Sequence, residues 1–273
     1  MSDALEIVVD GIPCSESWTQ DRSLQYGDGL FETMLVRSGR IRFELLHAAR
    51  LARGCERLEI HADQRSIWAQ AGLLAQRHGN AVLKLQLSRG DAVVRGYAPS
   101  GAEQPRLILS VFPAPLAGQL PAEIRAVTSG HRLGENPVLA GKKHCNRLEQ
   151  VLARASLRHS GAFEGLMGSS SGLLISGTMS NVFMELDGEL VTPVLERCGI
   201  EGVLRAVVLR EARQMGIAVR VTDIPMSAIA RCRSLAVSNA RHGLLPVHQL
   251  DGRALPRNEP LHALATRIDG LEE

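Results

Sequence analysis

Two adjacent lysines, Lys142 and Lys143, precede a helix-like segment in the sequence AGKKHCNRLEQ, residues 140–150. A lysine amine forms a Schiff base with a carbonyl compound only when enough of it is unprotonated, and desolvation or a neighbouring cation promotes that state. A solvated basic turn is the more common role of an arbitrary Lys-Lys pair. The motif by itself therefore leaves covalent carbonyl chemistry and a plain surface turn both open.

Three further features could bind a ligand. The stretch ISGTMSNVF, residues 175–183, places small polar residues between two strand-like runs, which is typical of a β-turn and of a ligand-binding loop alike. In CGIEGVLRAVV, residues 198–208, glycines precede a helix whose first N–H groups and dipole favour a phosphate, although most such helix starts bind no ligand. Arg50 lies among alanine and leucine residues, which is unusual for a purely solvated side chain, although it could extend to water.

The composition is neither strongly basic nor typical of a disulfide-rich protein. The 31 Lys and Arg residues exceed the 29 acidic residues by only two, so there is no nucleic-acid footprint. Five dispersed cysteines without C-x-x-C spacing argue against a disulfide framework and a structural zinc site, and no histidine spacing supports a metal site. The N-terminus does not resemble a secretory signal, and no apolar run approaches the roughly 18 residues that span a bilayer. We expect a cytoplasmic protein with no nucleic-acid, membrane or metal partner.

The elements that carry these residues follow one another without regular alternation of strand and helix, which predicts an α+β architecture. Residues 44–60 show the apolar stripe of an amphipathic helix, formed by Leu45, Ala48, Ala52, Cys55 and Leu58. Aromatic residues make up only 3% of the chain, so the core must be built mainly from Leu, Val, Ile and Ala. Ser38-Gly39 separates two strand-like runs and predicts a hairpin turn.

The length of 273 residues suits one large or two modest domains. The segment PAPLAGQLP, from Pro113 to Pro121, contains three prolines and a glycine, which break both regular structures. We therefore predict a smaller N-terminal α/β domain over residues 1–113, a linker over 114–120 and a larger C-terminal α/β domain over 121–273.

Seven segments, taken in order, resemble the aminodeoxychorismate lyases: YGDGLFET, HAARL, SRGDAVVRGY, HRLGENPVLAGKKHCNRLEQV, ISGTMSNVF, GIEGVLR and VSNA. These lyases are pyridoxal-phosphate enzymes of fold type IV, related to the branched-chain and D-amino-acid transaminases. The resemblance runs from about residue 20 to residue 247 and is most specific over residues 131–151. It implies the two-domain fold of D-amino-acid aminotransferase and a homodimer with the active site near the subunit interface.

The resemblance also assigns cofactor contacts. Lys143 matches the lysine that forms the Schiff base with pyridoxal 5'-phosphate, whereas Lys142 receives no catalytic role. Arg50 matches the arginine that pairs with the cofactor phosphate, whose oxygens suit a guanidinium fork. The remaining phosphate contacts are implied for Val203, Leu204, Asn239 and Ala240.

The substrate implied by the resemblance, 4-amino-4-deoxychorismate, carries two carboxylates, so cationic side chains should line its pocket. Arg95, on the loop after the strand that ends near Ser88, is the most plausible of them, although a loop residue without contact to the substrate is equally compatible with the sequence. Tyr97 is expected to contact the ring or a carboxylate, and the Arg95-Gly96-Tyr97 motif favours the lyase over the transaminase branch. We assign no catalytic role to the histidines His47, His131 and His144.

Ser176 departs from the family pattern. Fold-type IV enzymes usually place a glutamate against the pyridine nitrogen of the cofactor, and alignment of the GTMSN motif puts Ser176 at that position. A carboxylate keeps the ring nitrogen protonated and makes the ring a deep electron sink, whereas a serine hydroxyl can at most donate a hydrogen bond to a neutral nitrogen. The chain is then either an inactive relative or an enzyme whose reaction does not need a deep sink. Formation of an aromatic product drives the lyase reaction, so we favour the second interpretation.

The predicted function is conversion of 4-amino-4-deoxychorismate to 4-aminobenzoate and pyruvate in folate biosynthesis, with aminodeoxychorismate synthase as a transient partner. Two alternatives remain open at this point. One is a D-amino-acid or branched-chain transaminase of the same fold. The other is a catalytically silent relative that binds pyridoxal phosphate.

Overall fold

The computed structural model describes residues 6–13, 20–92, 96–115 and 123–271. These residues form two compact units. The first unit comprises Met1–Ala117, Lys142–Asn146 and the terminal Glu273, and the second comprises Gly118–Gly141 and Arg147–Glu272.

The segment Lys142–Asn146 thus groups with the first unit, although the sequence placed it within the C-terminal domain. The reason is that the main chain of this segment pairs with Gly29 and Phe31 of the first unit. Residues 116–120 of the predicted linker lie outside the described residues, and the linker stays a prediction.

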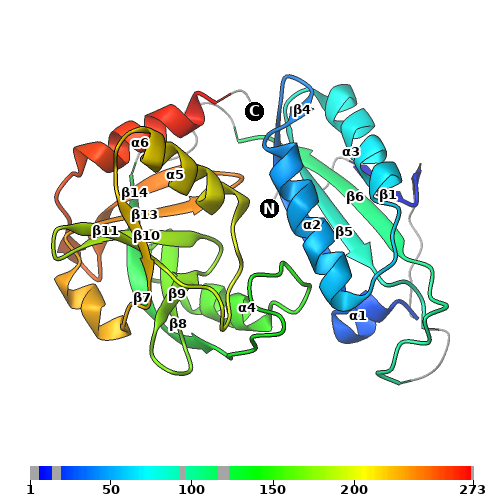
Figure 1. The fold of residues 1–273 in the computed structure, drawn as a ribbon, viewed down its shortest axis with the longest axis horizontal. Helices are drawn as coiled ribbons and strands as arrows, with labels where there is room; N and C mark the ends of the chain where they lie inside the picture. The colour runs from blue at the N-terminus through cyan, green and yellow to red at the C-terminus, as the bar shows by residue number, and fades with distance from the viewer. Residues whose placement is uncertain (1–5, 14–19, 93–95, 116–122, 272–273) are drawn as a thin grey trace. The chain divides into compact units, whose positions relative to one another are not determined.

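The first unit is built on a six-stranded sheet with the order β2-β1-β6-β5-β3-β4. The strands are β1 (Glu6–Val9), β2 (Ile12–Pro13), β3 (Gly29–Arg37), β4 (Arg40–Ile41), β5 (Ala81–Ser88) and β6 (Arg106–Pro113). The helices are α1 (Arg22–Tyr26), α2 (Glu44–Leu58) and α3 (Gln64–His78). All strand pairings in this sheet are antiparallel, and α2 and α3 pack against it (Figure 1).

The turn between β3 and β4 confirms the predicted hairpin. Arg37 pairs with Arg40, so Ser38 and Gly39 are the two turn residues. Their φ angles are 48° and 75°, which match a type I′ turn, the form whose twist suits two antiparallel strands. Glycine supplies one of the two positive φ angles without steric cost.

The buried face of α2 differs from the predicted apolar stripe. Leu45 is 83% exposed, and of the five predicted positions only Cys55 is buried. The helix instead buries His47, Arg50, Leu51, Gly54 and Cys55. His47 and Arg50 are buried because they face the carboxylate of Glu32 on β3. The spacing of apolar residues along a helix cannot reveal such a partner.

The second unit contains a nine-stranded mixed sheet, with the order β12-β11-β10-β13-β14-β7-β8-β9 and β15 paired to β14. Its strands are β7 (Ile124–Leu133), β8 (Glu164–Ser169), β9 (Leu174–Gly177), β10 (Asn181–Leu186), β11 (Glu189–Pro193), β12 (Val219–Thr222), β13 (Ser234–Asn239), β14 (Gly243–Leu250) and β15 (Arg253–Ala254). Its helices are α4 (Leu148–Ser156), α5 (Val203–Gln214) and α6 (Glu259–Asp269), with a 3-10 turn at Met226–Arg231. Helices α5 and α6 pack against each other and α6 lies on β14 (Figure 1).

Both units have aliphatic cores, as the low aromatic content predicts. In the first unit the fully buried side chains include Leu83, Leu85 and Leu109, and in the second Val182 and Val191. Strands and helices mix in both units, which confirms the α+β prediction. Among the residues described, no helix combines the length and apolar character that a membrane span requires.

Candidate active site

Lys143 is held by main-chain pairing at the start of β3. Its carbonyl accepts a hydrogen bond from the Phe31 N–H at 2.9 Å, and the Cys145 N–H donates to the Gly29 carbonyl at 2.9 Å. An antiparallel bridge joins Leu30 to His144 between them. The segment therefore extends the sheet of the first unit, which fixes the backbone from which the Lys143 side chain projects.

The amine of Lys143 lies against an aromatic ring. Its Nζ is 4.2 Å from the centroid of Phe31, and Lys84 Nζ from β5 is 6.0 Å from the same centroid. A cation over a ring face is attracted by the ring quadrupole, so Phe31 orients the half-buried lysine. The sequence had assigned no role to Phe31 or Lys84. Phe31 lies on β3, the strand that pairs with the Lys143 segment, and Lys84 lies on β5, which pairs with β3.

Glu32, next to Phe31 on β3, forms a buried cluster with two residues of α2. Arg50 Nε donates to Glu32 Oε1 at 2.8 Å and Arg50 Nη2 donates to Oε2. His47 Nδ1 lies 2.7 Å from Oε2. Glu32 is 1% exposed, His47 0% and Arg50 6%, so the guanidinium that the sequence assigned to a phosphate is fixed along one edge by a carboxylate.

The charges in this cluster set its protonation states. Burial opposes ionisation of Glu32, but Arg50 and His47 outweigh it and lower the pKa of the carboxyl to about 2. Burial lowers the pKa of His47, Glu32 opposes this, and the positive charges of Arg50 and Lys143 lower it further. His47 is therefore neutral at neutral pH, with Nδ1–H assigned as the donor to Glu32. Its Nε2 is buried and has no hydrogen-bond partner among the described residues.

In the second unit, α5 begins without a hydrogen bond from a capping side chain. Its N-cap, Gly202, supplies no side-chain cap, and Val203 and Leu204 at the first two helical positions are 4% and 1% exposed. The first N–H groups of a helix have no partner within it, and together with the helix dipole they favour an anion. A Cβ at Gly202 would lie 2.0 Å from Asn181 Oδ1, so only glycine fits this close approach.

Asn239 and Ala240 lie where β13 ends. The Asn239 Oδ1 accepts from the N–H groups of Arg241 at 3.1 Å and His242 at 2.8 Å, so this side chain shapes the turn that follows the strand. The neighbouring Ser238 is 2% exposed, and its hydroxyl has no hydrogen-bond partner among the described residues. Ser238 stands opposite Asn181 in the register of β13 and β10. A buried hydroxyl without a partner suits a ligand oxygen, and the sequence had not singled it out.

Ser176 lies on β9, opposite Met167 of β8, and is 8% exposed. The nearby loop is organised by Glu164, a residue that the sequence had not singled out. Glu164 is fully buried and accepts from the Thr178 N–H at 2.8 Å, the Thr178 hydroxyl and the Ser180 hydroxyl at 2.7 Å. Because both of its oxygens are engaged in this way, Glu164 holds the loop and does not replace the missing glutamate.

Two residues were assigned to the substrate, and the structure describes one of them. Arg95 lies outside the described residues. Tyr97 is described; its side chain is 85% exposed, with its ring centroid 5.3 Å from that of Tyr26. Within the described part of the chain, no group of three or more His, Cys, Asp or Glu side chains could hold a metal ion.

Each unit, taken by itself, has residue types that pyridoxal phosphate, a phosphate ester that also carries an aldehyde, would need. The first unit offers an amine at Lys143 and a fixed guanidinium at Arg50. The second unit offers the start of α5, the narrow approach at Gly202 and the hydroxyl of Ser238, which has no partner in the described part of the chain. Amine, cation and N–H donors are the groups that an aldehyde and a phosphate require.

Gly202→Ala is expected to weaken the binding of pyridoxal phosphate by about tenfold or more, a cost of about 1.4 kcal/mol. The added Cβ would displace Asn181 and break the hydrogen bond from its Nδ2 to the Ile200 carbonyl, 2.9 Å in length. Fluorescence titration of the cofactor-free protein measures the effect. Gly72→Ala is the matched control, because its Cβ on α3 would meet no atom within 4 Å. Equal affinity in the two variants would contradict a phosphate site at α5.

Comparison with known proteins identifies the family. Residues 29–250 match the family described as amino-transferase class IV. The aminodeoxychorismate lyase of Vibrio harveyi is 34% identical over 271 residues, which cover 96% of this chain and 97% of the relative. The crystal structure of 4-amino-4-deoxychorismate lyase from Pseudomonas aeruginosa matches with a TM-score of 0.91 and 40% identity, over 98% of this chain and 100% of that chain.

A bifunctional aminodeoxychorismate lyase and D-amino acid transaminase of Mycobacterium tuberculosis is 28% identical over 97% of this chain and 95% of its own length. The match to the Pseudomonas structure over almost the whole chain confirms the fold-type IV prediction. The chain therefore belongs to the amino-transferase class IV family and, within it, groups with the aminodeoxychorismate lyases.

Proposed function

We propose that the protein is a lyase that uses pyridoxal phosphate to convert 4-amino-4-deoxychorismate to 4-aminobenzoate and pyruvate, a reaction of folate biosynthesis. One observation carries the proposal: the backbone of Lys143 is paired with β3 in a chain 34% identical, over nearly its whole length, to an aminodeoxychorismate lyase. The similarity to the lyases supports the choice of substrate, and the lysine supports the proposed chemistry.

Pyridoxal phosphate, when bound, withdraws electrons from the carbon that bears the substrate amine. The protein residues have separate roles around it. Arg50, the N–H groups of Val203 and Leu204, and the loop of Asn239 and Ala240 bind the phosphate.

Lys143 is the general base. With the cofactor and substrate bound, its amine would accept the proton from the amine-bearing ring carbon. The C–O bond to the enolpyruvyl group then breaks, the ring becomes aromatic, and protonation of the released enol gives pyruvate. Phe31 limits the positions open to the amine, since its ring lies 4.2 Å from Nζ.

Alignment with the family assigns Ser176 to the position opposite the pyridine nitrogen, and a serine there favours the lyase over a transaminase. Transamination must stabilise a carbanion until a proton is delivered elsewhere, whereas the lyase reaction gains an aromatic ring. Ser176→Glu is expected to raise turnover of D-alanine with 2-oxoglutarate and to change lyase turnover less than about tenfold. Ser176→Ala is the control for loss of the hydroxyl alone. A hundredfold gain in lyase activity in Ser176→Glu would show instead that the serine is a defect.

The test of the function is a balance of products. Purified protein loaded with pyridoxal phosphate and supplied with aminodeoxychorismate alone is expected to release pyruvate and 4-aminobenzoate in equal amounts. A transaminase would need an amino acceptor such as 2-oxoglutarate and would turn over D-alanine or a branched-chain amino acid. If the protein binds the cofactor but releases neither product, the remaining interpretation is a catalytically silent relative.

We propose further that the enzyme is a cytoplasmic homodimer that receives its substrate from aminodeoxychorismate synthase. The resemblance to fold-type IV enzymes supports the dimer, and the four described cysteines, which form no disulfide with one another, are compatible with a reducing compartment. Light scattering of the purified protein measures the oligomeric state, and a monomer at micromolar concentration would contradict this part of the proposal.

A further inference from the structure

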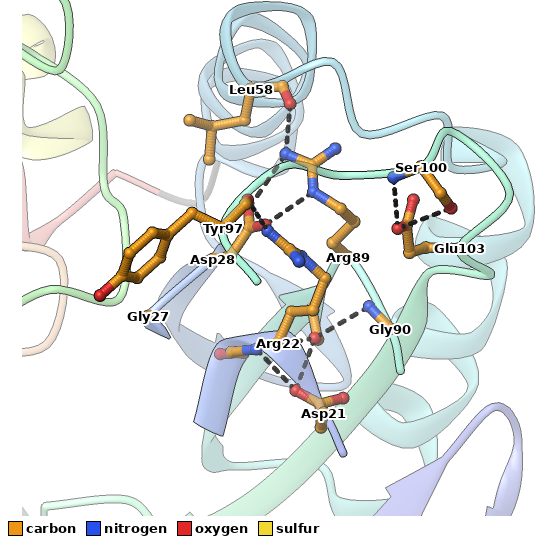
Figure 2. Close-up of polar contacts among 12 residues, drawn as sticks. Asp21, Arg22, Gly27, Asp28, Leu58, Arg89, Gly90, Tyr97, Ser100 and Glu103 are labelled. Atoms are coloured by element: carbon orange, nitrogen blue, oxygen red, sulfur yellow. Dashed lines mark hydrogen bonds and ion pairs between the residues drawn. The ribbon is translucent and has the colours of Figure 1, made fainter. Parts of the chain in front are cut away.

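The loop that joins β5 to β6 presents an exposed tyrosine on a fixed backbone. Its described residues are 89–92 and 96–105. The Tyr97 side chain is 85% exposed, yet the carbonyls of Gly96 and Tyr97 accept hydrogen bonds from Arg22 of α1 (Figure 2). Binding residues are commonly found on loops that a rigid scaffold holds in place.

Arg22 of α1 clamps this loop. Its Nη1 donates to the Gly96 carbonyl at 3.1 Å and its Nη2 to the Tyr97 carbonyl at 2.5 Å. Its Nε donates to Asp28 Oδ2 at 2.9 Å. The residue is only 2% exposed, so this guanidinium, with its rigid set of donors, is committed to three oxygens inside the protein (Figure 2).

Asp28 connects the clamp to the strand that carries the Lys143 segment. It also accepts from Arg89 Nε at 2.7 Å and Arg89 Nη2 at 3.0 Å. Burial raises the pKa of Asp28, but Arg89 and Arg22 outweigh it and keep the carboxyl ionised. Asp28 directly precedes Gly29, whose carbonyl accepts from the Cys145 N–H.

Arg89 anchors the same network to α2. Its Nη2 donates to the Leu58 carbonyl at 2.6 Å and its Nη1 to the Glu59 carbonyl at 3.0 Å (Figure 2). Two arginines thus share one carboxylate and bind four main-chain carbonyls. A network of this kind fixes the distance between the loop and the start of β3, since neither end can move without breaking charge-assisted hydrogen bonds.

The Tyr97 ring is fixed as well. It meets Tyr26 edge-on, with centroids 5.3 Å apart and an interplanar angle of 63°. The Arg22 guanidinium carbon lies 5.0 Å from the Tyr26 centroid. Further along the loop, Glu103 closes a turn by accepting from the N–H groups of Ser100 at 2.7 Å and Gly101 at 2.9 Å. An exposed aromatic ring held in this way loses little conformational freedom when a ligand binds.

We propose that Arg22 is a positioning residue for substrate binding. By binding the Gly96 and Tyr97 carbonyls together with Asp28, it sets the position of Tyr97 relative to the strand edge that carries Lys143. The Tyr97 loop then meets a small, ring-shaped dicarboxylate without prior rearrangement. The inference rests on the proposed lyase function for its substrate, and it concerns a residue that touches neither substrate nor cofactor.

The test is a double-mutant cycle on the loaded enzyme, with Arg22→Met, Tyr97→Ala and the double variant. Arg22→Met is expected to raise the KM for aminodeoxychorismate about tenfold or more and to change kcat less than threefold, because misplaced binding groups weaken substrate binding without altering the reacting lysine. The double variant is expected to show a KM no higher than that of Tyr97→Ala, since Arg22 acts through Tyr97. Cofactor absorbance should be the same in all variants.

Arg257→Met is the control, because Arg257 is an exposed arginine paired with Glu259 in the second unit. If Arg22→Met does not fold, Arg22→Lys retains a charge for Asp28 but cannot reach both carbonyls, and its KM should also rise. An unchanged KM in either variant, or effects of Arg22 and Tyr97 that multiply, would overturn the inference. Wild-type protein without lyase activity would refute the proposed function instead, so the two failures are distinguishable.

Discussion

Lys143→Ala is expected to lower pyruvate release from aminodeoxychorismate by a factor of about a thousand or more. The variant loses both the amine that holds the cofactor covalently and the general base for the ring proton. It should also lose the visible absorbance band that borohydride abolishes in the wild-type protein. A coupled pyruvate assay and an absorbance spectrum of the same sample measure both effects.

Lys142→Ala is the matched control, since it removes the neighbouring lysine and leaves the pairing of residues 143–145 with β3 unchanged. Its activity should stay within a few-fold of wild type. Equal loss of activity in both variants would show that the segment as a whole matters, and not the amine at position 143.

Glu32→Gln is expected to lower the free energy of unfolding by about 3–5 kcal/mol, the usual cost of removing one partner from a buried ion pair. Arg50, at 6% exposure, would keep its charge in the interior with a neutral amide in place of the carboxylate. Urea unfolding at pH 7 measures the loss. Glu56→Gln on the exposed side of α2 is the control and should cost less than about 0.5 kcal/mol.

The same comparison at low pH tests the charge on Glu32. The folded pKa of about 2 lies below the value of about 4.3 for an unfolded glutamate. The stabilisation is therefore present above pH of about 4.3 and is lost as the pH falls towards 2. The difference between wild type and Glu32→Gln should shrink between pH 5 and the lowest pH at which both proteins fold. A difference that does not change with pH would contradict an ionised, paired Glu32.

Local sequence signals predicted the local structure well. The Ser38-Gly39 turn followed from residue types because its two positive φ angles are a property of four consecutive residues. The helix start at Gly202 was also predicted from glycines before an apolar helix. Both features depend on neighbours in the chain, which is why the sequence alone could reveal them.

Contacts between distant segments were not predictable in this way. The apolar stripe on α2 was wrong because Glu32, fifteen residues before His47, buries the polar side of the helix. The grouping of Lys142–Asn146 with the first unit depends on pairing with Gly29 and Phe31, more than a hundred residues away. The sequence did contain one signal for the role of Glu32, since it is an acidic residue within the largely apolar strand GLFETMLVR.

The candidate site divides in the same manner. Residue types and the resemblance named Lys143, Arg50 and the start of α5. They did not name Ser238 or Glu164, because an unpartnered hydroxyl and a loop-organising carboxylate are recognised only from the atoms around them.

The central claim, that Lys143 carries the cofactor, is tested most directly by locating the covalent link. The chain has only three lysines, Lys84, Lys142 and Lys143, so borohydride reduction of the loaded enzyme followed by peptide mass spectrometry distinguishes them. We predict a reduced phosphopyridoxyl group on Lys143 in stoichiometric amount, with Lys84 and Lys142 unmodified. A label on either of the other two lysines, or none at all, would contradict it.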